Sequence, residues 1–136
     1  IDYAQAALDR CSNLLAEQQL SASLAQADVL EWLPPEPVDV VYEQTCLCAL
    51  HPDYWVRYAL QLQAWLKPSG RLCAMFMQRP ATGVGEGYII GPPYHCDVHA
   101  MRALFPASHW DWPAPPYESL KHPLGMVELA LILTRR

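Results

Sequence analysis

Acidic side chains follow apolar stretches near the start of this sequence, in places where a protein can hold a nucleotide. Asp2 comes after an apolar residue and just before a helical pattern. A carboxylate there can accept two ribose hydroxyls, or it can simply begin the helix. Asp28 and Val29 follow a weakly apolar stretch, where the acid can accept from an adenine amino group while Val29 packs on the ring. The alternative for Asp28 is a solvated loop acid.

A third polar group, Glu43, Gln44 and Thr45, closes a β-branched run at residues 38–42. In a parallel sheet the carboxyl ends of the strands form the edge at which α/β proteins bind ligands. Polar residues also end strands for purely structural reasons, so both interpretations stay open for these three residues.

Two groups of cysteines and histidines have residue types that suit zinc, because thiolate and neutral imidazole are its usual ligands. They are Cys46, Cys48 and His51, and His95, Cys96 and His99. Their spacing is not that of a zinc finger, and no local signature pairs a thiol with a histidine base. We therefore expect these residues to pack in the core and expect no metal, with a zinc-binding protein as a weaker alternative.

Residues 78–96 are rich in glycine and proline, which predicts a long loop, and long loops in compact domains often carry function. Gly83, Gly85 and Gly87 imitate a phosphate-binding fingerprint, but no helix follows to supply its N-terminus. Tyr88 and Tyr94 in this loop can line a pocket for a flat, apolar ligand.

The elements that must position these residues alternate between helix and strand. Apolar residues at helical spacing or a capping aspartate predict helices, and β-branched or apolar runs predict buried strands. We expect helices at residues 4–15, at 55–66 and just after Asp97, and strands at residues 38–42, 72–77 and 126–133. Residues 20–30 fit a short strand weakly. This order predicts an α/β fold with a mainly parallel sheet.

Composition narrows the class of protein. With 52% hydrophobic and 17% charged residues, the chain supports one globular domain, residues 1–136, with a sizeable core. A net charge of -5 argues against nucleic-acid and anionic-membrane partners, and no apolar run approaches the ~20 residues that cross a bilayer. Five cysteines, an odd number lying mostly within apolar segments, and the lack of a basic-then-apolar leader favour a soluble, cytoplasmic protein.

Taken together, several segments resemble the thiopurine methyltransferase family, which belongs to the S-adenosylmethionine-dependent methyltransferases with a Rossmann-like sheet. They are Ile1-Asp2 before a helix, Asp28-Val29, and the stretches VDVVYE, CALHPDYW, LKPSGRLCAMF, GPPYHCDVHAMRALF and HPLGMVELALILTRR. The resemblance covers all of this chain but only the later part of a family member. It implies a Rossmann-like methyltransferase sheet, mostly parallel with an antiparallel last strand, that is incomplete on its N-terminal side.

The resemblance also implies a chemistry, methyl transfer from the cofactor S-adenosylmethionine to a small-molecule acceptor that we expect to be a thiol. The implied cofactor-binding residues are Asp2, Tyr3, Asp28, Val29, Tyr42 and Glu43, with Asp2 on the ribose and Asp28-Val29 on the adenine. The residues that border or cover the acceptor are Gln44, Tyr88 and Tyr94. No base is assigned, because a thiol ionises near ~8.5 and is a good nucleophile.

Two features depart from the family pattern. Glu43-Gln44 stands where the family usually has Asp-Arg, and Trp55 stands where it has an arginine, so we expect acceptor recognition to differ. The family's first strand and glycine-rich turn lie upstream of Ile1. Because that strand sits in mid-sheet, we expect either an upstream segment or a homodimer that rebuilds the sheet. The alternative function is a catalytically inactive, methyltransferase-derived module that acts as a dimeric or partner-binding protein.

Overall fold

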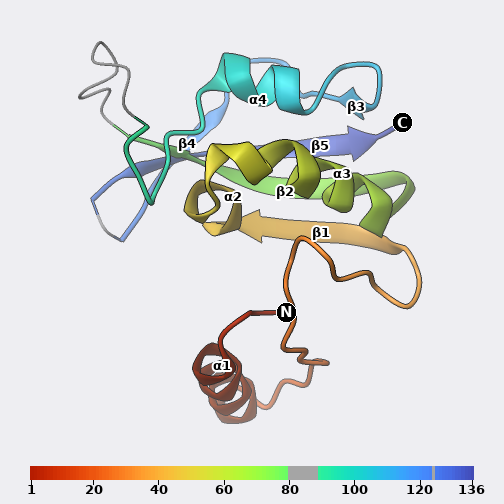
Figure 1. The fold of residues 1–136 in the computed structure, drawn as a ribbon, viewed down its shortest axis with the longest axis vertical. Coiled ribbons are helices and arrows are strands. Elements are labelled where there is room, and N and C mark those ends of the chain that lie inside the picture. The colour runs from red at the N-terminus through yellow and green to blue at the C-terminus, as the bar shows by residue number, and fades with distance from the viewer. Residues whose placement is uncertain (80–88, 124) are drawn as a thin grey trace. The chain divides into compact units, whose positions relative to one another are not determined.

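The computed structural model describes residues 1–79, 89–123 and 125–136. Its elements, shown in Figure 1, are α1 (Gln5–Glu17), β1 (Val38–Gln44), α2 (Cys46–Ala49), the 3-10 helix η1 (Pro52–Tyr54), α3 (Trp55–Trp65), β2 (Leu66–Gln78), α4 (Val98–Leu104), β3 (Trp110–Asp111), β4 (Glu118–Lys121) and β5 (Val127–Arg135). The chain divides into an N-terminal unit, Ile1–Leu33, and a C-terminal unit, Pro34–Arg136. In the part of the chain that the structure describes, no helix has the length and apolar character needed to span a membrane.

The C-terminal unit is built on a five-stranded sheet in the order β1-β2-β5-β3, with β4 also paired to β5. β1 and β2 are parallel and β5 is antiparallel to β2, which confirms the predicted α/β class with an antiparallel last strand. Gln44 at the end of β1 pairs with Met75, and Gln78 at the end of β2 pairs with Val127 at the start of β5. The ends of β1 and β2 and the start of β5 therefore lie side by side at the same end of the sheet, which we call the strand-end edge.

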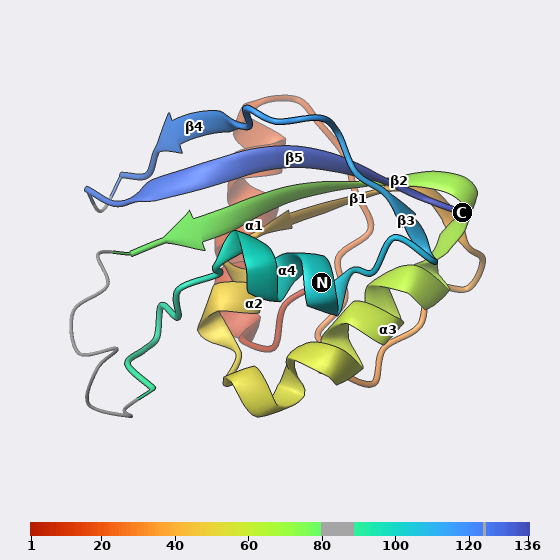
Figure 2. The ribbon, with the colours of Figure 1, turned by 90° about the horizontal axis from the view of Figure 1, so that it is seen from above.

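The core lies between one face of this sheet and the helices α2, α3 and α4, which cover it together (Figure 2). Alternate residues of β2 are buried against them, as expected from the period of two in a strand. The buried residues include Leu72, Ala74 and Phe76 of β2, Leu131 and Leu133 of β5, and Tyr58, Ala59, Leu62 and Trp65 of α3. On the opposite face Val40, Tyr42 and Ile132 are exposed.

The LKPSG segment, residues 66–70, follows α3 directly and belongs to the start of β2. Val38 pairs with Leu66 but Val40 pairs with Arg71, so the residues between them interrupt the ladder. At Gly70 a Cβ would lie 2.8 Å from the carbonyl oxygen of Lys67, so a side chain has no room there. The glycine thus allows a turn to be built into the strand.

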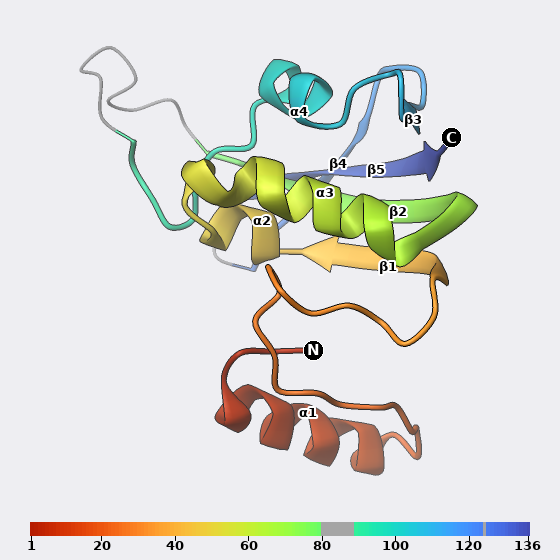
Figure 3. The ribbon, with the colours of Figure 1, turned by 45° about the vertical axis from the view of Figure 1, so that its right-hand side comes forward.

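The N-terminal unit consists of α1 and an extended segment that returns to the start of the chain (Figure 3). Instead of a short strand, residues 20–30 supply an isolated parallel bridge between Asp2 and Gln26. The Asp2 N–H donates to the Ala25 carbonyl at 3.2 Å, and the Ala27 N–H donates to the Asp2 carbonyl at 3.0 Å. α1 is helical as predicted, but of its apolar stripe Leu8 alone is fully buried.

Candidate functional site

The two acids expected to hold the cofactor lie at the ends of neighbouring segments of the N-terminal unit. The Asp2–Gln26 bridge brings these segments together, and Asp28 follows two residues later. Asp2 Oδ1 accepts from the Ala4 N–H at 2.7 Å, and Asp28 Oδ1 accepts from the Leu30 N–H at 2.8 Å. Both acids are exposed. Each therefore orders its own turn with one oxygen, while no bond engages its second oxygen within the described residues.

The neighbours of these acids are held by weaker contacts. The Tyr3 side chain is among the most exposed apolar groups of the chain, and its carbonyl accepts from Gln26 Nε2 at 3.1 Å. Val29 is half-buried. Asp2, Tyr3, Asp28 and Val29 therefore all lie in the N-terminal unit, and the Asp2–Gln26 bridge joins the two segments that carry them.

At the end of β1 three side chains form a series of hydrogen bonds, which we call the Tyr42–Gln44–Glu128 chain. The Tyr42 hydroxyl donates to Gln44 Oε1 at 2.5 Å, and Gln44 Nε2 donates to Glu128 Oε2 at 2.9 Å. Tyr42 is 64% exposed and Glu128 is 2% exposed, so the series runs from solvent to the interior. Glu128 pairs with Met77 near the start of β5, which places it at the strand-end edge.

Glu43 points to the helix-covered face of the sheet and is buried. Its Oε1 accepts from the Leu47 N–H of α2 at 2.7 Å. Burial raises the pKa of Glu43 to about 7; backbone hydrogen bonds from Leu47 and Cys46 oppose this shift, and the charge of Glu128 adds to it. Glu43 therefore holds a proton up to neutral pH and attaches α2 to the end of β1.

Tyr94, expected on the acceptor side, is positioned by α2. Its N–H donates to the Cys48 carbonyl at 2.6 Å, and its ring lies edge-on to His51 with 5.6 Å between centroids. Glu43 thus bonds α2 at Leu47, and the Tyr94 backbone bonds α2 at Cys48. Tyr88, Gly83, Gly85 and Gly87 lie outside the described residues.

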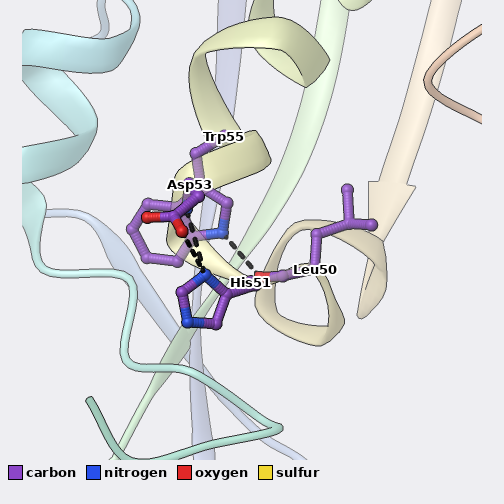
Figure 4. A network of polar contacts seen from close by, with 4 residues as sticks. All are labelled: Leu50, His51, Asp53 and Trp55. Carbon is purple, nitrogen blue, oxygen red and sulfur yellow. Dashed lines mark hydrogen bonds and ion pairs between the residues drawn. The ribbon is translucent and has the colours of Figure 1, made fainter. Parts of the chain in front are cut away.

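Trp55, which replaces the family's arginine, serves as a structural donor. Its Nε1 lies 2.9 Å from the carbonyl oxygens of both Leu47 and Leu50, and Figure 4 shows the second of these bonds. His51 Nδ1 lies 3.3 Å from the Asp53 carboxylate and accepts from the Asp53 N–H at 3.4 Å (Figure 4). The indole therefore ties α3 to α2 and brings no positive charge to the site.

The cysteines and histidines considered as zinc ligands do not assemble. Among residues 1–79, 89–123 and 125–136, no three His, Cys, Asp or Glu side chains gather as a metal site. His95 Nδ1 instead accepts from the Arg79 N–H at 3.0 Å. Burial, followed by the charges of Glu43 and Glu128, raises the pKa of the Cys48 thiol to about 11. A thiol that stays protonated is a poor nucleophile, which disfavours a Cys–His pair.

Glu128 was not among the residues predicted from the sequence. Its signal is an acid inside an apolar run at residues 126–133. Carboxylates are rarely fully buried unless they are paired, so an acid within a strand that reads as buried deserves a functional hypothesis. What the sequence cannot supply is its partner, because Gln44 lies 84 positions away.

Replacing Gly91 with alanine is expected to displace the Tyr94 ring. A Cβ at Gly91 would lie 2.3 Å from Tyr94 Cδ1, so the ring must move away from its present place beside His51. Overpacking of this kind costs about 1 to 3 kcal/mol, which denaturant unfolding measures. In a Y94A background G91A should cost nothing, and a cost that persists there would show that Tyr94 is not the obstacle.

Comparison with known proteins identifies the family to which the chain belongs. The family model described as thiopurine S-methyltransferase matches residues 5–122. Thiocyanate methyltransferase 1 of Arabidopsis thaliana is 29% identical over 82 residues, which are 60% of this chain and 34% of that protein. A thiopurine S-methyltransferase of Vibrio cholerae is 33% identical over 72 residues, 53% of this chain and 31% of that protein. The chain therefore spans about a third of the length of these curated relatives.

A solved structure agrees with the fold. The crystal structure of Burkholderia thailandensis 1,6-didemethyltoxoflavin-N1-methyltransferase with bound 1,6-didemethyltoxoflavin and S-adenosylhomocysteine superposes with a TM-score of 0.64 at 16% identity. The match covers 93% of this chain and 56% of that one. The sheet is thus a methyltransferase-type α/β sheet, and because the family model spans most of the sequence, the chain belongs to the thiopurine S-methyltransferase family.

Proposed function

We propose that this protein transfers a methyl group from S-adenosylmethionine to a small-molecule thiol. The observation that carries the proposal is the family match over residues 5–122, which includes Asp28 and the strand end Tyr42, Glu43 and Gln44. Curated relatives named for thiocyanate and thiopurine methylation support sulfur as the atom that receives the methyl group.

The acids of the N-terminal unit fit the adenosine part of this cofactor. Asp2 and Asp28 are exposed, and each has a carboxylate oxygen free of bonds within the described residues. Such oxygens accept charge-assisted hydrogen bonds from hydroxyl and amino groups. We assign Asp2, with Tyr3, to the ribose and Asp28, with Val29, to the adenine. Tyr42 and Glu43 are assigned to the methionine moiety.

The acceptor side has to bind and orient a thiol and exclude water. When bound, S-adenosylmethionine supplies an electrophilic methyl group that a thiolate takes with its own electron pair. Gln44 is half-buried at the strand-end edge and offers an amide to the acceptor, while Tyr94 and His51 supply an aromatic wall. We also propose that Tyr88 contacts the acceptor. Orientation of this kind supplies much of the rate in a displacement, and a thiol needs little help from a base.

The setting of the protein is proposed from its cysteines and its sheet. No disulfide joins the five cysteines, all of which lie in the part of the chain that the structure describes, and this supports a reducing, cytoplasmic location. A small molecule is the proposed partner. For the 136-residue chain by itself we also propose self-association, because β1 is an edge strand of the described sheet and edge strands pair readily. The non-catalytic module finds no support among the named relatives, which are methyltransferases.

Calorimetric titration of the full-length protein with S-adenosylhomocysteine tests the cofactor assignment without any acceptor. We expect a dissociation constant on the order of micromolar or tighter. Transfer of a labelled methyl group from S-adenosylmethionine to thiophenol, a simple aromatic thiol, then tests the acceptor class, with phenol as the matched oxygen control. Absence of binding at millimolar ligand would contradict the proposed function.

A further inference from the structure

We propose that Glu128 is a positioning residue for the acceptor, which it serves by fixing the orientation of the Gln44 amide. In that orientation one N–H of Gln44 is held by Glu128 and the other is presented to the sulfur of the thiol. This inference rests on the proposed function and deepens it, since it names what selects the acceptor and a residue that the family resemblance does not assign.

Both polar atoms of the Gln44 amide group take part in hydrogen bonds. Gln44 Oε1 accepts from the Tyr42 hydroxyl at 2.5 Å, while Gln44 Nε2 donates to Glu128 Oε2 at 2.9 Å. Rotating the amide by half a turn would set its oxygen against the Glu128 oxygen and its NH2 against the Tyr42 hydroxyl. The first of these contacts would lose its donor, so the two hydrogen bonds select one orientation.

Glu128 is suited to this role by its burial. It is 2% exposed, and its second oxygen, Oε1, is buried and accepts no hydrogen bond from the residues that the structure describes. A buried carboxylate with a single amide donor is costly, so its presence in an apolar strand calls for a function that offsets the cost. The hydrogen bond that Glu128 Oε2 accepts from Gln44 Nε2 gives the amide nitrogen a partner in the interior.

The fixed amide determines what Gln44 offers to a ligand. An amide NH2 has two donors, and among the described residues one of them is used, by Glu128. Its oxygen is already engaged by Tyr42. Gln44 therefore presents a donor, which favours an acceptor whose reacting atom carries lone pairs or negative charge, as a thiolate sulfur does. The expected contribution is to acceptor binding, and the cofactor should be unaffected.

Three variants separate positioning from structure. E128Q places an amide that both donates and accepts opposite Gln44, so the Gln44 amide loses its preferred orientation. The exchange variant Q44E/E128Q restores a hydrogen bond between the two positions and keeps an acceptor for Tyr42, but position 44 then has no N–H for the sulfur. E118Q, on the exposed strand β4, is the matched control for removing one acidic charge from the same sheet.

Two measurements on the full-length protein test the inference. In methyl transfer to thiophenol, E128Q and the exchange variant should raise KM for the thiol by about tenfold or more, while E118Q stays within about twofold. The exchange variant should keep the parent's melting temperature and S-adenosylhomocysteine affinity. A parental thiol KM in the exchange variant would overturn the inference, because a merely structural pair would be repaired by the exchange.

The second measurement needs no activity. The side-chain NH2 resonances of Gln44 in the ligand-free protein should move in E128Q and stay in place in E118Q, and unchanged resonances in E128Q would also overturn the inference. A parent protein that binds no S-adenosylhomocysteine contradicts the proposed function instead, and it leaves the resonance test of Glu128 intact.

Discussion

Replacing Asp2 with alanine is expected to weaken S-adenosylhomocysteine binding by about 2 to 4 kcal/mol, a factor of roughly 30 to 1,000. The reason is the loss of two charge-assisted hydrogen bonds to the ribose hydroxyls. Calorimetric titration of the parent and the variant in the same buffer gives the difference directly.

The structural role of Asp2 has to be separated from this effect. Its Oδ1 accepts from the Ala4 N–H ahead of α1, so D2A also weakens the start of the helix. Asp2→Asn keeps an oxygen for that N–H and removes the charge, and it should still lose much of the affinity. D9A is the matched control, because Asp9 lies on α1 and bonds Gln5. If D2A binds the product as tightly as D9A does, the ribose assignment is wrong.

Much of the fold could be predicted because its elements are defined by local periodicity. Buried strands at residues 72–77 and 126–133 and a helix at 55–66 follow from apolar spacing and are present. The interrupted start of β2 could not be predicted, because it depends on the pairing of Val38 with Leu66, which extends the ladder back beyond the turn residues. β4 has no buried residue to mark it and exists through its pairing with β5.

A residue of the candidate site could be predicted where its position along a single strand is enough to place it. Gln44 ends β1 at the edge where parallel strands bind ligands, and the structure places it there. Glu128 was missed because its role depends on the register of three strands, which joins residues far apart in the chain. Trp55 was marked as a departure, but the sequence could not show that its indole bonds the α2 segment instead of a ligand.

The second prediction with a large expected effect concerns pH. The parent protein should lose stability as pH rises, and the E43Q variant should not show this loss. The pKa of Glu43 is raised by burial from 4.5 to about 7 in the folded protein. A raised carboxyl pKa means that the folded state binds the proton more tightly than the unfolded state does. The protonated Glu43 carboxyl group therefore makes its full contribution to the free energy of unfolding below pH 4.5, and this contribution is lost as pH rises toward 7. The full loss is about 3 kcal/mol.

E43Q is a close test because glutamine keeps an oxygen for the Leu47 N–H and is neutral at every pH. Denaturant unfolding should give similar stabilities for parent and variant near about pH 5, and a variant more stable by about 2 to 3 kcal/mol near about pH 8. The control variant E118Q, which neutralises an exposed acid, should show the same dependence of stability on pH as the parent. Parallel stability curves for parent and E43Q would mean that Glu43 is ionised in the fold at neutral pH.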